Sequence, residues 1–334
     1  MLDQRTVLAM LRAAAEPTRL RILALLTQGE LSVKDLTRIL NQSQPRISRH
    51  LKLMVEAGLI DRLRDGSWAY FQLVAHGDRG RLAEALLGSI DPLDPVLERD
   101  RARADMVKRE REAAAQTYFQ TNAPEWDRIR SLYVTEGEVE AAVRQALGDG
   151  PFALLVDLGT GTGRMLELLA GRYDRAVGFD INHTMLAYAR SKLEQSGIGD
   201  ASVRHGDLYE VALPDGAADA VIMHQVLHFL IDPTRAIEEA ARILAPGGRL
   251  IVVDFAPHDM EFLRERFAHE RLGFSKAQIA QWLAEAGLDL ADERDLVPAV
   301  RGEEGKLTVS VWTAVRPARV DARTSGNARK RVDA

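Results

Sequence analysis

Apolar residues between positions 150 and 256 occur as short continuous runs separated by stretches with helical spacing. Continuous apolar runs are typical of strands buried on both faces of a parallel sheet. After the first run, Met165, Leu166, Leu168 and Leu169 recur at the spacing of one helix face. This half of the chain therefore predicts an α/β sheet, with strands expected at Phe152–Val156, Ala176–Phe179, Ser202–Arg204, Ala220–Met223 and Ile251–Phe255.

The first 75 residues show a different pattern, in which short helical repeats precede two alternating segments. We expect helices at Val7–Ala15, from Glu16 to Gly29, from Ser32 to Leu40 and at Pro45–Ala57. Ser32 suits an N-cap, and Gly29 and Gly58 suit helix ends. The Asp65-Gly66 pair is typical of a two-residue turn between strands. The pattern predicts a helix-turn-helix followed by a hairpin, which is a winged helix.

The remaining segments carry weaker patterns. Residues 82–87 are apolar except for Glu84 and suggest a dimerisation helix, and Val96–Ala115 is typical of a charge-dense linker helix. Aromatic residues at 118, 119 and 126 follow this helix, and either a cofactor lid or ordinary core packing would explain them. The tail from Pro317 is basic and poor in apolar residues, so we expect it to be disordered.

Composition narrows the classes of function. The chain has 334 residues, 46% of them hydrophobic, which suits a multidomain globular protein. It has no cysteine, which excludes disulfides and thiolate chemistry. No long apolar stretch or signal peptide is apparent, so we expect a cytoplasmic protein with no membrane partner. No metal site is expected either, since zinc–thiolate ligation is excluded and no other metal-ligating group stands out.

Charge is distributed unevenly along the chain. Residues 1–74 hold 11 Lys and Arg against 7 Asp and Glu, a net of +4, whereas the whole chain has a net charge of −5. A basic end on an acidic body favours a nucleic-acid interface at that end. In the expected fourth helix, one face would be buried and the other would present polar and basic side chains to base edges and phosphates.

The candidate ligand chemistry centres on a glycine-rich loop, Asp157–Arg164, between the first strand and its helix. A dinucleotide fingerprint requires a third glycine at position 164, where this chain has arginine. The carboxylate of Asp157 disfavours phosphate and suits an ammonium group. S-adenosylmethionine carries an amino group and a sulfonium without phosphate, although a plain tight turn remains the alternative.

Polar residues at the ends of the next strands extend this candidate site. Asp180 ends the second strand and is placed to accept both ribose hydroxyls, while Met185 or Leu186 is placed to pack on adenine. Asp207 follows the third strand and is placed to accept from the adenine amino group. His224 ends the fourth strand and is a candidate base or ligand contact, with a structural role as the alternative.

Taken together, residues 150–256 resemble class I S-adenosylmethionine-dependent methyltransferases. The resemblance is carried by Asp157–Gly163, Asp180, Gly206-Asp207, Val226-Leu227-His228 and Pro246-Gly247-Gly248. It implies a Rossmann-like, seven-stranded sheet whose last two strands, at 288–296 and 307–315, form an antiparallel hairpin. With the lid aromatics, it implies an adenosyl-ligand site made of Asp157, Gly159, Thr160, Gly161, Gly163, Asp180, Ile181, Met185, Gly206, Asp207, Leu208, His224 and Tyr118.

Residues 5–75 are similar to the ArsR family of winged-helix repressors. Glu16–Leu23, Ser43–Leu51 and Glu56–Ile60 carry the similarity. It implies a homodimer on a two-fold operator. With the exposed helix face, it implies DNA contacts by Ser43, Gln44, Arg46, Ser48, Arg49, His50, Lys52 and Arg64. Where many members carry a cysteine pair for metal, this chain has Ser32 and Lys34, so metal sensing of that kind is lost.

We therefore expect a winged helix at 1–75, dimerisation and linker helices at 76–116, a methyltransferase-like domain at 117–316 and a disordered basic tail at 317–334. The architecture resembles repressors of methionine and methyl-cycle genes that respond to S-adenosylhomocysteine. The alternative is an active methyltransferase of a small molecule with an autoregulatory DNA-binding domain. Nucleic-acid methylation is the weakest hypothesis, because His224–Leu227 stands where those enzymes have their proline-containing motif.

Overall fold

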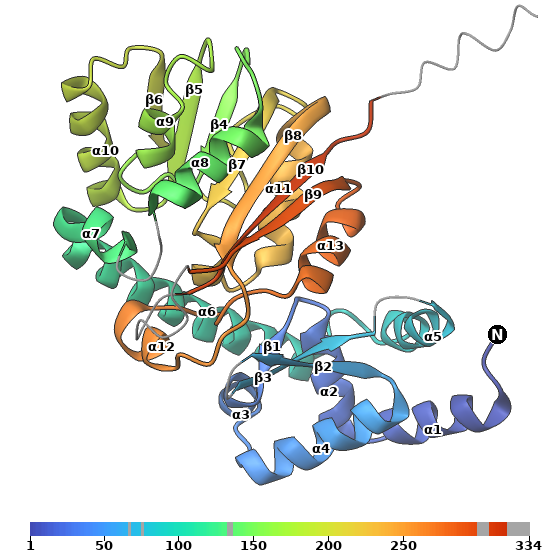
Figure 1. Cartoon of the computed structure of the whole chain (residues 1–334). Helices are drawn as coiled ribbons and strands as arrows, with labels where there is room; N and C mark the ends of the chain where they lie inside the picture. Colours follow the sequence, from blue (N-terminus) through green and yellow to red (C-terminus); the bar gives the residue numbers. More distant parts are fainter. Residues whose placement is uncertain (66–67, 75–76, 132–135, 299–306, 319–334) are drawn as a thin grey trace, which may run out of the picture. The chain divides into compact units, whose positions relative to one another are not determined.

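The computed structural model describes residues 1–65, 68–74, 77–131, 136–298 and 307–318 (Figure 1). Within these ranges the chain forms two compact units. Unit 1 contains residues 1–122, 228–233 and 257–274, and unit 2 contains 123–227, 234–256 and the chain from 275 onward. The expected tail beyond residue 318 and the Gly66 position of the hairpin turn lie outside the described residues.

Unit 1 begins with a winged helix. Its elements are α1 (Gln4–Ala14), α2 (Pro17–Leu26), β1 (Leu31–Ser32), α3 (Val33–Leu40), α4 (Gln44–Ala57), β2 (Ile60–Asp65) and β3 (Trp68–Leu73). The strands form an antiparallel sheet in the order β1-β3-β2. The expected helices and hairpin are confirmed, and the two-residue strand β1 is an addition that the sequence pattern did not predict.

Local chemistry explains where these helices begin and end. Ser32 and Asp35 form a reciprocal capping box at the start of α3. Asn41 ends α3 and Gly58 ends α4, both in the left-handed conformation. The buried faces of these helices meet in one core with β3, centred on Ile22, Leu23, Leu25, Leu36, Ile39, Ile47, Leu51, Met54 and Phe71.

Two further helices and two returning segments complete unit 1. Helix α5 spans Gly77–Gly88, and α6 spans Pro95–Asn122, seven residues beyond the expected end at Ala115. Val107 of α6 joins the winged-helix core. The segment 257–274, which holds α12 (Phe262–Phe267), also belongs to this unit.

Unit 2 is built on a seven-stranded sheet in the order β6-β5-β4-β7-β8-β10-β9. The strands are β4 (Leu155–Leu158), β5 (Ala176–Asp180), β6 (Ala201–His205), β7 (Ala218–His224), β8 (Leu244–Phe255), β9 (Asp289–Leu296) and β10 (Val309–Val315). All neighbours from β6 to β8 pair in parallel, and β10 is antiparallel to β8 and β9. This confirms the expected Rossmann-like sheet and its late hairpin.

The helices of unit 2 surround this sheet. The unit contains η1 (Ala123–Glu125), α7 (Trp126–Ser131), α8 (Glu136–Leu147), α9 (Arg164–Leu168), α10 (His183–Gln195), α11 (Pro233–Ile243) and α13 (Lys276–Glu285). Helix α8 packs across β8, β9 and β10, while α10 packs on β5 and β6. Among the described residues, no helix is long and apolar enough to cross a membrane.

The strands β4 and β8 depart most from their expected bounds. The strand β4 runs from Leu155 to Leu158 instead of Phe152–Val156, and Phe152 makes only an isolated bridge to Tyr173. The Pro246-Gly247-Gly248 sequence lies inside β8 and not before it, at the point where the pairing jumps from Ala218–Leu244 to Ala220–Arg249. The extra residues of β8 leave the ladder there as a bulge, with Gly247 at φ 80°.

Candidate functional site

The glycine-rich loop between β4 and α9 has a backbone that only glycine adopts easily. Gly159, Gly161 and Gly163 have φ values of 76°, 52° and 79°, all in the left-handed region. A Cβ at Gly159 would lie 2.3 Å from Cγ2 of Val226, and one at Gly163 would lie 3.2 Å from Cβ of Ala189. The loop is thus held close to its neighbours, and side chains at Gly159 and Gly163 would displace them.

Asp157 lies at the base of this loop, within β4, and is only 1% exposed. Its Oδ2 accepts a hydrogen bond of 2.6 Å from the hydroxyl of Thr160. The Thr160 side chain packs against Gly178 of β5, and a larger residue there would collide with it, because a Cβ at position 178 would lie 2.5 Å from Thr160 Oγ1. Gly178 is a supporting residue that sequence reasoning missed, because a glycine inside a strand gives no sign of its neighbour.

Asp180 ends β5 beside the loop. Its carboxylate accepts from the backbone N–H of Gly161 at 2.9 Å and from that of Asn182 at 2.8 Å. Burial raises the pKa of Asp180, and these backbone donors oppose the rise. Asp180 therefore ties the loop to the second strand and brings one carboxylate to the edge of the sheet where β4 and β5 end.

Trp126 and Asp127 of α7 hold the loop from another side. The indole Nε1 of Trp126 would lie 3.4 Å from a Cβ at Gly161. The carboxylate of Asp127 accepts from Thr162 Oγ1 and from Lys192 Nζ, each at 2.7 Å. The sequence marked Trp126 as a lid or core aromatic, and the contact with Gly161 favours a place beside the ligand loop.

The other expected contacts differ in exposure and in position. Ile181 is 44% exposed, whereas Met185 is 2% exposed and packs into the core face of α10. Asp207 is exposed and accepts from the N–H of Tyr209, with Gly206 before it and buried Leu208 after it. His224, the last residue of β7, is half-buried. Tyr118 lies in unit 1, where its ring makes edge contacts with Phe119 and Phe267.

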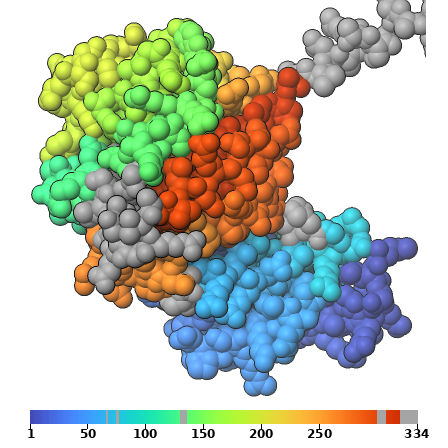
Figure 2. All heavy atoms as spheres, viewed as in Figure 1, coloured from blue at the N-terminus to red at the C-terminus, as the bar shows by residue number. Residues whose placement is uncertain are grey.

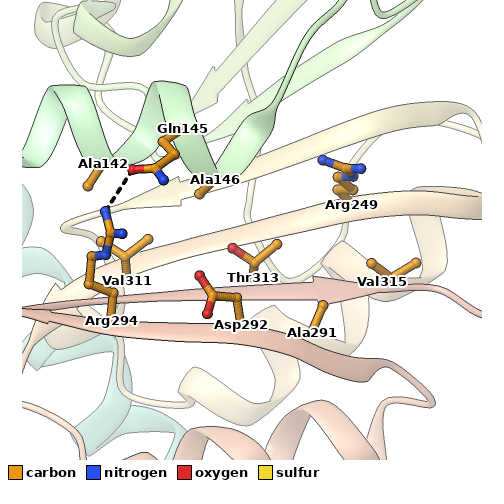
Figure 3. Close-up of a pocket in the computed structure, with 10 residues that line it drawn as sticks. All are labelled: Ala142, Gln145, Ala146, Arg249, Ala291, Asp292, Arg294, Val311, Thr313 and Val315. Atoms are coloured by element: carbon orange, nitrogen blue, oxygen red, sulfur yellow. Dashed lines mark hydrogen bonds between the residues drawn. The ribbon is translucent and has the colours of Figure 1, made fainter.

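A cavity of about 280 Å³ lies elsewhere in unit 2 (Figure 3). It opens between α8 and strands β8 to β10, and Arg294 on its wall donates to Gln145. None of the expected adenosyl contacts lines it, so this cavity is separate from the loop site.

The second candidate site is the surface of α4 in unit 1, within the blue part of the surface in Figure 2. The side chains expected to contact DNA are exposed, except for His50, which is half-buried: Ser43, Gln44, Arg46, Ser48, Arg49, Lys52 and Arg64. Burial lowers the pKa of His50, and nearby arginines lower it further. The carboxylate of Glu16, whose Oε2 lies 3.7 Å from His50 Nδ1, opposes this by raising the pKa. We therefore expect His50 to be neutral at pH 7 and to act as a hydrogen-bonding group.

The loop site fits an adenosyl ligand better than a nucleotide. Asp157 and Asp180 are acceptors for ammonium and hydroxyl groups, and no Lys or Arg side chain bonds the glycine loop in the described contacts. Among the described residues, no cluster of three or more His, Asp or Glu side chains is arranged to hold a metal. The fold and the site define a protein that joins a winged helix to a Rossmann-like, adenosyl-binding domain.

Comparison with known proteins agrees with this class. Residues 16–62 match the family model of bacterial regulatory proteins of the arsR family, and residues 156–252 match a methyltransferase domain. The chain therefore joins an ArsR-family helix-turn-helix to a methyltransferase domain. Together with the loop geometry, this domain indicates S-adenosylmethionine or S-adenosylhomocysteine as the ligand.

Individual relatives match only the methyltransferase part. The chain is 37% identical over 144 residues to a demethylmenaquinone methyltransferase of Thermus thermophilus, covering 42% of this chain and 64% of the relative. It is 32% identical over 124 residues to the ubiquinone/menaquinone biosynthesis C-methyltransferase UbiE of Vibrio cholerae, covering 36% and 48%. The chain thus spans less than two thirds of either relative.

One chain of a solved complex between a methyltransferase and the Haloferax volcanii Trm112 methyltransferase activator is similar in fold to this protein. The TM-score is 0.50 at 23% sequence identity, and the match covers 60% of this chain and 97% of that chain.

Proposed function

We propose that the protein is a transcription regulator whose methyltransferase domain binds S-adenosylhomocysteine or S-adenosylmethionine and thereby controls operator binding. The observation that carries the proposal is the presence on one chain of an exposed basic recognition helix and a glycine-rich adenosyl loop. A regulator needs a DNA surface and a ligand whose affinity differs between the DNA-bound and free states. The chain supplies both surfaces.

The finer parts of this proposal rest on the ArsR resemblance. We infer a repressor that acts in the cytoplasm as a homodimer on a two-fold operator, and genes of the methionine and S-adenosylmethionine cycle as its targets. The domain division at residues 75, 116 and 316 belongs to the same proposal, although α6 runs without a break across position 116.

An operator titration tests the regulatory role directly. The operator is first selected from the DNA upstream of the gene and of methyl-cycle genes. Its affinity is then measured by fluorescence anisotropy without ligand, with saturating S-adenosylhomocysteine and with saturating S-adenosylmethionine. Allosteric coupling of about 1–3 kcal/mol predicts a change of roughly 5- to 150-fold in operator affinity. An identical DNA midpoint in all three titrations contradicts the regulator.

The alternative function is methyl transfer to a small molecule, with the winged helix controlling the protein's own expression. The similarity to quinone methyltransferases over the catalytic domain favours this alternative. Methyl transfer depends mainly on holding the acceptor in line with the methyl group, so it needs no cysteine or metal. Transfer of labelled methyl from S-adenosylmethionine to a demethylated quinol, at several turnovers per minute, would support the enzyme.

A further inference from the structure

The segment between β8 and α13, residues 257–274, is part of the DNA-binding unit although it lies within the methyltransferase sequence. We call it the β8 segment. It bonds to the wing, which is the hairpin of β2 and β3, through two buried arginines, Arg264 and Arg271. Their side chains are 6% and 5% exposed.

Arg264 binds the tip of the wing. Its Nη2 lies 3.0 Å from Oδ1 of Asp65, the last residue of β2, and donates to the Asp65 carbonyl at 3.1 Å. The guanidinium also lies 4.6 Å from the ring centre of Trp68, the first residue of β3. The backbone N–H of Leu272 adds a bond of 2.9 Å to Asp65. Both strands of the wing are therefore bonded to the β8 segment beside their turn.

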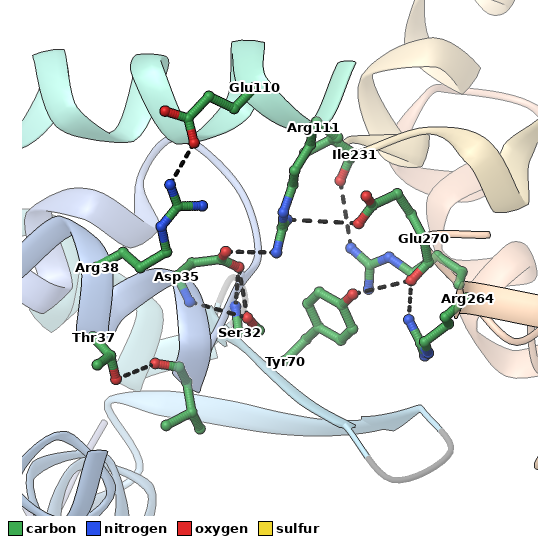
Figure 4. A network of polar contacts seen from close by, with 12 residues as sticks. Ser32, Asp35, Thr37, Arg38, Tyr70, Glu110, Arg111, Ile231, Arg264 and Glu270 are labelled. Carbon is green, nitrogen blue, oxygen red and sulfur yellow. Dashed lines mark hydrogen bonds and ion pairs between the residues drawn. The ribbon is translucent and has the colours of Figure 1, made fainter. Parts of the chain in front are cut away.

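Arg271 contacts the middle of the wing and the residue that precedes β1. Its Nη1 lies 2.7 Å from Oε2 of Glu30, which precedes β1. Its guanidinium lies 3.7 Å from the ring centre of Tyr70, and the Tyr70 hydroxyl donates to the carbonyl of Glu270 at 3.1 Å (Figure 4). The second anchor therefore joins the β8 segment to the central strand of the small sheet.

A third arginine connects this segment to the helix-turn-helix. Arg111 of α6 lies between two carboxylates, with Nη2 2.5 Å from Asp35 and Nη1 3.6 Å from Glu270 (Figure 4). Asp35 is the capping-box residue of α3, the first helix of the helix-turn-helix. A displacement of Glu270 would thus alter the bonding of Arg111 as well as that of the wing.

The chain connects these anchors to the strands of the methyltransferase sheet. The β8 segment starts two residues after Phe255, the last residue of β8, and ends just before α13. The segment 228–233, which follows β7, is bonded to it, because the N–H groups of Glu270 and Arg271 donate to the carbonyl of His228. In doubly wound sheets, ligands bind outside the carboxyl ends of the strands, and both segments leave from such ends.

We propose that the β8 segment carries the adenosyl-ligand state to the wing, with Arg264 and Arg271 as its anchors. This inference rests on the proposed function. The linker helix α6 then acts as a support that Arg111 joins to the segment, and the wing is the element whose position the ligand changes. Arg264 and Arg271 are positioning residues, since DNA contact is made by the wing and α4.

The test compares Arg264→Gln and Arg271→Gln with the wild type in operator titrations, with and without saturating S-adenosylhomocysteine. The wild-type shift of roughly 5- to 150-fold is expected to fall below about threefold in both variants. Calorimetric affinity for S-adenosylhomocysteine is expected to stay at the wild-type value, since neither residue contacts the glycine loop in the described structure. Asp65→Asn removes the negative charge that pairs with Arg264 from the wing side, and it is expected to weaken the ligand shift in the same direction if either arginine variant fails to fold.

Lys276→Gln is the matched control, because Lys276 lies two residues beyond the β8 segment and bonds Glu293 of β9 at 3.0 Å instead of the wing. It is expected to keep the wild-type shift. Hydrogen exchange gives a second readout. S-adenosylhomocysteine is expected to change the protection of the β2 and β3 amides in the wild type, and to leave their protection unchanged in Arg264→Gln.

The outcomes separate the two proposals. A full ligand shift in Arg264→Gln, Arg271→Gln and Asp65→Asn overturns the transmission role and leaves the regulator intact. A wild type without any operator shift refutes the proposed function, and unchanged wing protection on ligand binding then overturns this inference as well.

Discussion

Replacement of Gly159 by alanine tests the geometry of the adenosyl loop quantitatively. Two costs arise, because the residue has φ 76° and because its Cβ would lie 2.3 Å from Cγ2 and 2.8 Å from Cβ of Val226. Left-handed backbone costs a residue with a Cβ about 1–2 kcal/mol. Overpacking against a buried side chain costs about 1–3 kcal/mol more. We expect Gly159→Ala to lower the free energy of unfolding of unit 2 by about 2–5 kcal/mol and to abolish adenosyl-ligand binding.

Two further variants separate these costs. Gly197 has φ 66° and nothing within 4 Å of the position that a Cβ would take, so Gly197→Ala should lose only the backbone part, about 1–2 kcal/mol. The double variant Gly159→Ala/Val226→Ala removes the 2.3 Å contact with Cγ2 but keeps the Cβ of residue 226 at 2.8 Å. It should therefore be more stable than the sum of the single effects by part of the overpacking cost of about 1–3 kcal/mol. Urea unfolding followed by tryptophan fluorescence and circular dichroism is measured for the wild type, the double variant and the three single variants, which include Val226→Ala. Equal destabilisation by Gly159→Ala and Gly197→Ala would refute the close approach of the loop to Val226.

Four other substitutions test the ligand site, the DNA-binding surface and a helix cap. Asp180→Asn should weaken adenosyl-ligand binding more than tenfold by calorimetry, because a charged hydrogen-bond acceptor is lost. Because the pKa of Asp180 is higher in the folded protein than its ordinary value of 3.8, the free energy of unfolding of the wild type should fall as pH rises from 3.8 through the folded-state pKa. The ligand-free Asn variant should lack this fall in urea titrations at several pH values. Arg46→Ala and Arg49→Ala should each weaken operator binding by about 1–3 kcal/mol if they contact bases, whereas loss of a phosphate contact would lower the salt slope for all sequences. Ser32→Ala should destabilise unit 1 by about 0.5–2 kcal/mol in thermal unfolding, since it removes the capping box of α3.

Sequence reasoning succeeded where a structural feature depends on neighbouring residues. The N-cap at Ser32, the helix end at Gly58 and the loop between β4 and α9 were predicted, and all follow from local chemistry within a few positions. The seven-stranded sheet with a late antiparallel hairpin came from the family resemblance and was confirmed, whereas the order of its strands was not predicted. The start of β4 was misplaced by three residues, because a buried apolar run does not show which of its residues pair with the next strand.

Features that depend on distant contacts were missed. Helix α6 continues through Tyr118 to Asn122 because no glycine or proline marks a stop at Ala115, and charge density alone gave no end point. Arg264 and Arg271 look like ordinary surface charges in the sequence, since their partners Asp65 and Glu30 are about 200 or more positions away. The role of Gly178 beside Thr160 is hidden for the same reason.

The buried arginines of the β8 segment bear on function more than on stability. A buried ion pair recovers little net free energy, since the desolvation of both charges offsets their attraction, and well-packed apolar residues often serve folding as well. Arg264 nevertheless directs bonds to the Asp65 carboxylate, the Asp65 carbonyl and the carbonyl of Glu270, each of which requires a particular orientation. Apolar packing would hold the wing to the segment without fixing that orientation. Directional bonds instead couple the position of the wing to that of the segment, and this is the property that a ligand-dependent DNA-binding unit requires.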